Sequence, residues 1–307
     1  MEHFASGWKR SYYGKGDVIV YRLNRDAKAP VGASPVFGAN VLMLVYGDAF
    51  WPTYATGDNT GLIATDSMKN FIQRETMTFE GYDVEGLCRF LGEKFLATYP
   101  QVEGIQMSAT EIPYVGRVLP SHAVGRVPAS ASSMRAGPAE AMDAIAFSPS
   151  GPERAYARVE LGRGGAIETA SGIRGFKLLR LGGSAFHGFV RDEYTTLPDI
   201  TNRPLHMWLD LEWTYTSHEA AFSSGRITSQ VRAIVTDVFN RFESGSIQQV
   251  IHQMGTRMLA EIPAVAGVHL EADNRTWDTI AERGDELGVY TEARPPYGVL
   301  GLRLRRS

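Results

Sequence analysis

Cysteine is almost absent from this chain of 307 residues, which contains only Cys88. A single thiol cannot form an intramolecular disulfide, so a disulfide-rich secreted scaffold is excluded and a reducing compartment is indicated. Cys88 lies in an apolar helical pattern, which is typical of a small buried hydrophobic residue.

Long apolar runs are also missing. No stretch approaches the roughly 20 apolar residues that a transmembrane helix needs. Residues 1–14 have no apolar region behind a basic start, as a signal peptide would. The final Arg305-Arg306-Ser307 does not match the Ser-Lys-Leu peroxisomal address. We therefore expect a cytoplasmic protein with no membrane partner.

Neither sign of charge dominates the composition. The chain has 31 Lys and Arg against 34 Asp and Glu, a formal net charge of −3, which gives no electrostatic case for nucleic acid as a partner. Hydrophobic residues make up 44% and charged residues 21%, as in ordinary globular proteins. The length allows two domains or one two-part domain, and a small molecule is the partner that this composition favours.

Several site signatures are absent too. The seven histidines lack the His-Glu-x-x-His spacing of zinc hydrolases, so no metal site is expected. Residues 162–165, Gly-Arg-Gly-Gly, lack the spacing and following helix of a phosphate-binding loop and are better interpreted as a hairpin turn. No Gly-x-Ser-x-Gly nucleophile elbow is present.

The first half of the chain predicts two strands, two helices and two further strands. Alternating and β-rich runs predict strands over residues 17–23, 40–46, 102–112 and 155–161. Thr65, Asp66 and Ser67 are helix-capping residue types ahead of an apolar run. Asp83 is a candidate cap for a longer amphipathic helix that Pro100 ends.

The second half repeats this order of elements. The patterns predict strands at residues 173–181, 205–215, near Val268 and at 298–304, and helices at 221–242 and 247–259. Such a unit has helices on one face of an antiparallel sheet, and its other face and edges need cover. We predict an α+β fold of two tandem ββααββ units, residues 1–171 and 172–307. About residues 120–150, rich in Ala, Ser, Gly and Pro, are expected to form a flexible insertion without chemistry.

Three short segments carry the most specific signal. They are residues 13–15, Tyr-Gly-Lys; residues 64–70, Ala-Thr-Asp-Ser-Met-Lys-Asn; and residues 184–189, Ser-Ala-Phe-His-Gly-Phe. Alone, they are typical of a surface lysine, a helix cap and a core aromatic. In this order, the three segments resemble the urate oxidase (uricase) family, and the resemblance extends from Tyr13 to Leu304.

The resemblance implies a fold and an activity. Uricases have two tunnelling-fold (T-fold) units and assemble as homotetramers whose sheets close into barrels. They oxidise urate with molecular oxygen to 5-hydroxyisourate and hydrogen peroxide, and they use no cofactor. Their pocket draws residues from two neighbouring subunits, so the resemblance implies an obligate homo-oligomer with a small heterocycle and O2 as substrates.

The resemblance assigns the base to Lys15 and Thr65, which match the family positions that remove a proton from urate. A lysine can act as a base near neutral pH if desolvation or a positive neighbour lowers its pKa, and a threonine hydroxyl can pass the proton on. The backbone amide at Asp66 would hold the purine. Asn274 matches the asparagine that holds oxygen or water above the ring.

Further matches concern binding of the ring itself. Phe186 matches the phenylalanine on which urate stacks, since a flat heterocycle gains from an aromatic face. Arg203 matches the arginine that grips one edge, and Ile247 with Gln248 matches the pair that reads the opposite edge. A guanidinium fork and an amide present donors and an acceptor in one plane, as a purine edge requires.

The sequence departs from the family pattern at Asn202, Pro204 and Thr276, the last of which replaces the histidine of the proton relay. Histidine titrates near neutrality, and a threonine hydroxyl cannot hold a proton in the same way. Either water and Thr276 complete the relay, or the substrate differs. Two alternatives therefore stay open: an oxidase of another planar nitrogen heterocycle, and a non-catalytic purine- or pterin-binding protein.

Overall fold

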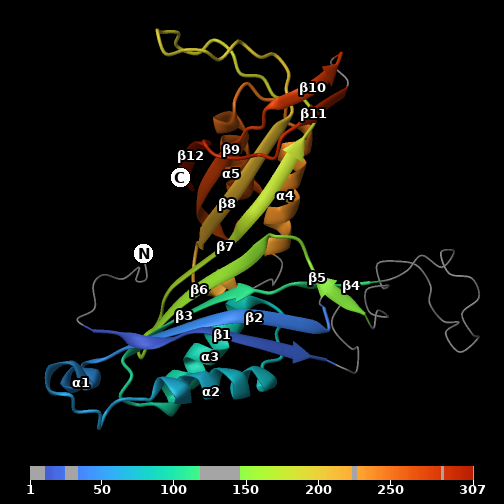
Figure 1. Cartoon of the computed structure of the whole chain (residues 1–307). Helices are drawn as coiled ribbons and strands as arrows, with labels where there is room; N and C mark the ends of the chain where they lie inside the picture. The colour runs from blue at the N-terminus through green and yellow to red at the C-terminus, as the bar shows by residue number, and fades with distance from the viewer. Residues whose placement is uncertain (1–10, 25–33, 118–145, 223–226, 285–286, 307) are drawn as a thin grey trace, which may run out of the picture. The chain divides into compact units, whose positions relative to one another are not determined.

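The computed structural model describes residues 11–24, 34–117, 146–222, 227–284 and 287–306 (Figure 1). Internal contacts divide the chain into two compact units, Met1–Thr169 and Ala170–Ser307. The division falls within one strand, and the sequence-based boundary after residue 171 lies in the same strand. Most of the insertion expected at about residues 120–150 lies outside the described residues.

The described residues of the first unit form an antiparallel sheet, three helices and shorter elements. The strands lie in the order β1 (Tyr13–Leu23), β2 (Val36–Tyr46), β3 (Gly104–Glu111) and β6 (Arg154–Gly162). The helices are α1 (Trp51–Thr56), α2 (Thr65–Glu75) and α3 (Val84–Thr98). Short 3-10 turns occupy Asp48–Phe50 and Thr76–Thr78, and β4 (Tyr114–Gly116) pairs with β5 (Phe147–Pro149).

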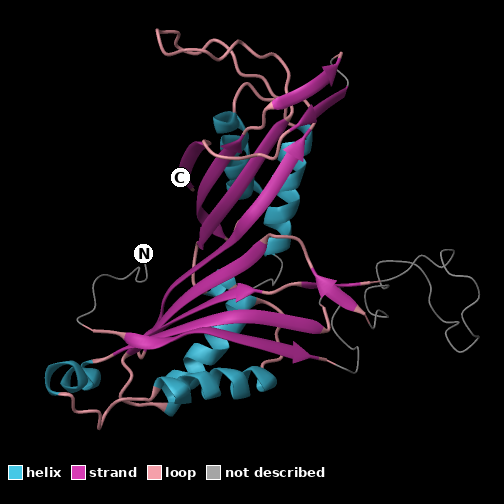
Figure 2. Ribbon diagram, in the orientation of Figure 1, coloured by secondary structure: helices cyan, strands magenta, loops and turns pink. Residues whose placement is uncertain are grey.

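Helices α2 and α3 cover one face of this sheet (Figure 2). Alternate residues of a strand point to the same face, and on β2 this places Val41, Met43 and Val45 in the core. Ile72 of α2 and Leu91 of α3 are fully buried as well. Cys88 of α3 is also fully buried, as predicted, and burial raises the pKa of its thiol.

The second unit has the same plan. Its antiparallel strands lie in the order β7 (Gly165–Arg180), β8 (Leu205–Tyr215), β9 (Val265–Arg275) and β12 (Gly298–Arg305). Its helices are α4 (Ile227–Arg241) and α5 (Ile247–Glu261), with a 3-10 turn at Glu219–Ala221. A hairpin of β10 (Thr279–Arg283) and β11 (Leu287–Tyr290) follows β9. The predicted α+β composition with antiparallel sheets is confirmed.

The core of the second unit lies between its sheet and its two helices. Leu209, Leu211 and Trp213 of β8 are buried at alternate positions, together with Val235 of α4 and Met254 of α5. The helix predicted near residues 221–242 corresponds to α4, described from Ile227 to Arg241; Ala221 itself ends the 3-10 turn, and residues 223–226 lie outside the described residues. No helix in the described part of the chain is long and apolar enough to cross a membrane.

Helix α2 begins earlier than its capping-type residues suggested. The N-cap is Ala64, which provides no side-chain hydrogen bond, and the carboxylate of Asp66 instead accepts from Lys69 Nζ at 2.5 Å and Asn70 Nδ2 at 3.0 Å. The capping interpretation of Thr65 and Asp66 was therefore wrong. The predicted cap at Asp83 is confirmed, because its carboxylate accepts from the amide of Gly86 at 2.6 Å.

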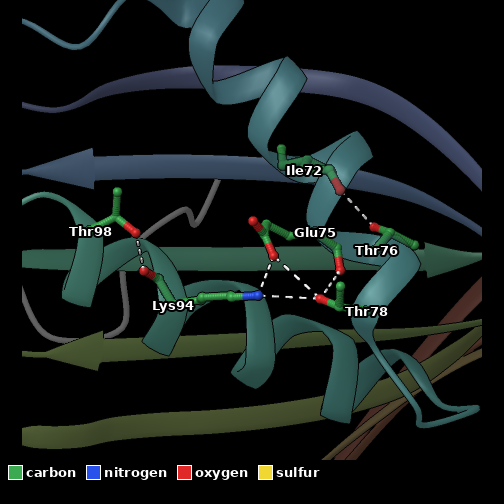
Figure 3. A network of polar contacts seen from close by, with 6 residues as sticks. All are labelled: Ile72, Glu75, Thr76, Thr78, Lys94 and Thr98. Atoms are coloured by element: carbon green, nitrogen blue, oxygen red, sulfur yellow. Dashed lines mark hydrogen bonds and ion pairs between the residues drawn. The ribbon is translucent and has the colours of Figure 1, made fainter.

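Figure 3 shows how the end of α2 is attached to α3. The carboxylate of Glu75 accepts a hydrogen bond from Lys94 Nζ, and that interaction lowers the pKa of Glu75. Thr78 Oγ1 donates to the carbonyl of Glu75 at 3.0 Å, and Thr76 Oγ1 donates to the carbonyl of Ile72 at 2.7 Å. These contacts anchor the C-terminal end of the helix whose first turn holds two of the candidate site residues.

Candidate functional site

The Tyr-Gly-Lys segment begins β1, and its tyrosine reaches the chain just before α2. Tyr13 Oη accepts a hydrogen bond from the amide of Ile63 at 2.9 Å, and its ring meets Phe50 edge-on with centroids 5.0 Å apart. Burial is the main cause that raises the pKa of Tyr13. Because Ile63 precedes Thr65 by two residues, this one side chain links the strand of Lys15 to the start of α2.

Gly14 allows β1 to approach β2 closely beside Lys15. A Cβ at Gly14 would lie 1.8 Å from the carbonyl oxygen of Met43, so no other residue fits without moving the strand. Lys15 pairs with Met43, and the register then shifts through a bulge at Asp17, whose φ is 60°. Such bulges bend a strand and re-aim its side chains, here directly after Lys15.

The first unit brings Lys15, Thr65 and Asp66 together. Asp66 has a lowered pKa, caused first by its hydrogen bond from Lys69 and also by the charge of Lys15. Thr65 is exposed and is the first residue of α2. The first amides of a helix have no partner within the helix, and they form its positive end. This arrangement offers the side-chain nitrogen of Lys15, the hydroxyl of Thr65 and backbone N–H donors to a ligand.

The second unit brings Phe186 and Arg203 together. Phe186 and Ile200 exchange backbone hydrogen bonds of 2.7 and 2.9 Å, and the Phe186 ring stacks on Phe189 at 4.9 Å between centroids and 11° between planes. The amide of Arg203 donates to the carbonyl of Ser184 at 2.9 Å, and its guanidinium carbon lies 5.9 Å from the Phe186 centroid. Phe186 as a whole is only partly buried.

Among these side chains, Arg203 gives the clearest indication of a ligand-binding position. Burial lowers its pKa, and its buried Nε has no hydrogen-bond partner among the described residues. A buried N–H without an acceptor costs free energy, so a ligand acceptor at this position would be favourable. The neighbouring Asn202 has a structural role instead, because its Oδ1 accepts from the amide of Gly183 at 2.8 Å.

The start of α5 is attached to the Phe186 loop. The amide of Ala185 donates to the carbonyl of Ser244 at 2.8 Å, and the amide of Ser244 donates to Gly183 at 3.1 Å. Ile247 is the first residue of α5 and is buried, whereas Gln248 is exposed. The structure thus brings Phe186, Arg203 and the start of α5 into one part of the second unit.

Asn274 lies near the end of β9, where it pairs with Met207 and Gly298, and Thr276 follows the strand and is exposed. Among the described residues, no hydrogen bond joins the side chain of Asn274 or Thr276 to Phe186 or Arg203. Between them, the guanidinium of Arg275 lies 3.9 Å from the centroid of Trp208 and 3.6 Å from that of Tyr297. This double stack fixes the end of β9.

Sequence reasoning missed the cross-strand aromatic cluster that contains Trp208. Lys177 Nζ of β7 lies 3.9 Å from the ring centroid of Trp208 on β8, and Trp208 Nε1 donates to His206 Nε2 at 3.2 Å. The pKa of His206 is lowered, first by burial and then by the charges of Lys177 and Arg275. The described part of the chain has no group of three or more His, Cys, Asp or Glu placed to hold a metal ion.

Comparisons with known proteins identify the family. A family model described as Uricase matches residues 169–300. The uricase of Halalkalicoccus jeotgali is 35% identical over 314 residues, which cover 96% of this chain and 98% of that protein. The chain belongs to the uricase family.

Other uricase relatives agree with this assignment. The uric acid degradation bifunctional protein PucL of Bacillus subtilis is 35% identical over 96% of this chain, and the chain spans 61% of that protein's length. A crystal structure of urate oxidase from Bacillus sp. TB-90 matches with a TM-score of 0.82 and 33% identity, covering 97% of this chain and 100% of that chain. The uricase resemblance of the sequence motifs is therefore confirmed.

Proposed function

We propose that this protein oxidises urate with O2 to 5-hydroxyisourate and hydrogen peroxide, without a metal or organic cofactor. Membership of the uricase family supports the reaction class. The observation that carries the proposal is the partly buried Phe186 ring beside Arg203, whose buried Nε has no partner among the described residues. Urate would stack on the ring while a urate carbonyl or ring nitrogen accepts from Arg203.

The remaining residues would complete the pocket and the chemistry. Lys15 and Thr65 would remove a proton from urate, and the amide of Asp66 would bind its edge. The electron-rich ring would reduce O2, and recombination would give a hydroperoxide at ring carbon five. Loss of hydrogen peroxide and addition of water would then give 5-hydroxyisourate.

Three further groups have proposed roles in this pocket. Ile247 and Gln248 would read the ring edge opposite Arg203. Asn274 would hold O2 and then water above the ring. Thr276, together with a water molecule, would pass protons where the family pattern has histidine.

We also propose that each half of the chain is a T-fold unit and that the protein is a homotetramer with barrel-like sheets. Lys15 and Thr65 would come from one subunit, and Phe186, Arg203 and Gln248 from its neighbour. The outer strands β1 and β12 support association, because sheet edges have backbone groups available for pairing. A stable monomer would then be inactive.

The test is oxygen uptake and peroxide release by metal-depleted protein given urate. We expect one O2 consumed and one peroxide released per urate, with both signals lost in Lys15→Met and Thr65→Ala. Lys94→Met is the matched control, because Lys94 lies on α3 and contacts Glu75 rather than the candidate site. This variant should oxidise urate at close to the wild-type rate.

The alternatives are outcomes of the same test. No oxygen uptake by the folded oligomer with urate would overturn the proposal. Oxygen uptake with another purine or a pterin would then identify an oxidase of a different heterocycle. Binding of a urate analogue, with no oxygen uptake for any compound offered, would identify a non-catalytic binding protein.

A further inference from the structure

We propose that Arg180 is a positioning residue that sets the geometry of the candidate substrate pocket by holding the segments that carry Phe186 and the start of α5. Arg180 is the last residue of β7 and is only 8% exposed. It belongs to none of the segments that resemble the uricase motifs. The effect on substrate binding rests on the proposed function, whereas the effect on the loop geometry does not.

Arg180 makes five hydrogen bonds, all to neutral acceptors. Nε and Nη2 donate to Ser184 Oγ at 3.0 and 2.6 Å, and Nη2 donates to Ser244 Oγ at 2.6 Å. Nη1 donates to the carbonyls of Phe239 and Phe242 at 3.1 and 2.7 Å. A guanidinium has five N–H groups, so this set of acceptors matches its full donor capacity.

The two carbonyls lie at the C-terminal end of α4, where helix geometry leaves carbonyls without partners and favours a cation. Burial lowers the pKa of Arg180. A buried charge whose hydrogen bonds all go to neutral groups costs desolvation energy, so it adds little to net stability. What Arg180 provides is a fixed spacing between the segment at Ser184 and the segment that runs from the end of α4 to Ser244.

One of these segments carries Phe186. Ser184 is 2% exposed, and its hydroxyl accepts two of the Arg180 donors. Its carbonyl accepts from the amide of Arg203, and Phe186 follows only two residues later. Movement of Ser184 would therefore displace the stacking ring and the arginine together.

The second segment leads into α5. Ser244 is 7% exposed and binds Arg180 through its hydroxyl, while its carbonyl accepts from the amide of Ala185. Three residues later α5 begins at Ile247, with Ser246 as its cap. Arg180 therefore joins the Phe186 loop and the start of α5 at adjacent points, which sets the distance between the groups proposed to bind the two edges of urate.

Arg180→Lys is the informative variant, because it keeps the charge but offers three donors from one atom and cannot span the same acceptors. Arg306→Lys is the matched control. Arg306 Nη2 also donates to backbone carbonyls, those of Leu259 and Ile262 at the C-terminal end of α5 and that of Val265 at the start of β9. Both variants lose a guanidinium fork in the same unit.

Two measurements separate positioning from simple stabilisation. Amide hydrogen exchange in the peptides spanning residues 183–189 and 244–249 measures how firmly these segments are held when no ligand is bound. Urate kinetics measure the effect on the pocket, where a displacement of 1 Å can cost about a hundredfold in rate. We expect faster exchange in both peptides and a KM for urate raised about tenfold or more in Arg180→Lys. Arg306→Lys should change neither.

The opposite pattern overturns the inference. Unchanged exchange and unchanged KM in Arg180→Lys, whatever its loss of stability, would make Arg180 merely structural. If Arg180→Lys does not fold, Ser184→Ala and Ser244→Ala decide, because each removes one acceptor and keeps the guanidinium. A wild-type protein that does not oxidise urate would refute the proposed function alone, since the exchange measurement still tests Arg180.

Discussion

Removing the hydroxyl of Tyr13 tests how the chain brings Lys15 to Thr65. In Tyr13→Phe the ring contact with Phe50 is retained, while the amide of Ile63 loses its acceptor at 2.9 Å. Ile63 is 5% exposed, so water has little access to that amide. A buried donor left without a partner costs about 1–3 kcal/mol.

For a unit of this size, each kcal/mol of lost stability lowers the melting temperature by about 2–4 °C. The effect on catalysis should be larger than the effect on stability suggests. Once released, the segment before α2 can shift Thr65 relative to Lys15, and we expect kcat for urate to fall at least about tenfold.

Tyr54→Phe is the control for this prediction. Tyr54 Oη donates to the carbonyl of Tyr12 at 2.7 Å, but Tyr54 is 52% exposed, so water can replace the lost bond. We expect its stability to change by less than about 0.5 kcal/mol and its kcat to stay at the wild-type value. Thermal melts and urate kinetics on both variants decide; equal behaviour of the two would refute the role assigned to the Tyr13 hydroxyl.

Three further predictions follow from local structure. Gly14→Ala should separate β1 from β2 at Met43 and abolish urate oxidation, which kinetics and circular dichroism would check; wild-type activity would contradict the close approach. Cys88 should resist a thiol reagent in the folded protein and react fully in denaturant, so rapid native labelling would contradict its burial. The lowered pKa of Glu75 means that its ion pair with Lys94 stabilises the fold above the unfolded pKa of Glu75 and is lost as pH falls through the folded pKa. Glu75→Gln should therefore cost less than about 1 kcal/mol at pH 7, and this cost should disappear as the pH falls through the folded pKa of Glu75, as denaturant titrations over an acidic pH series would show; a pH-independent difference would contradict it.

The sequence pattern predicted helices and strands well where one face is buried, because burial makes apolar residues recur at regular intervals along the chain. Strand β8 was predicted over residues 205–215 and spans Leu205–Tyr215, because its alternate residues are buried against α4 and α5. The start of α5 at Ile247 was also predicted. The hairpin of β10 and β11 was not predicted, because every residue of β10 is exposed and no core face imposes a pattern.

Tertiary contacts decided the features that local patterns missed. Capping-type residues alone could not fix the start of α2, because the segment before it is held by Tyr13 from β1. The candidate site residues could be predicted from motif resemblance, and their roles stay predictions. Arg180 and Arg275 gave no comparable signal, because their partners come from segments far apart in the sequence.

The central claim is that Lys15 and Thr65 of one subunit and Phe186 and Arg203 of its neighbour form one urate-oxidising site. The direct test is urate oxidation by mixed oligomers of Lys15→Met and Arg203→Gln, co-expressed with different tags and purified through both. Lys15→Met with Thr65→Ala is the control, because both changes fall in the same half of the site.

We predict that each variant alone and the control mixture are inactive, while the first mixture recovers oxidation in sites built from two intact halves. Mixed oligomers of Lys15→Met and Arg203→Gln that contain both chains and stay as inactive as their parents would contradict the claim.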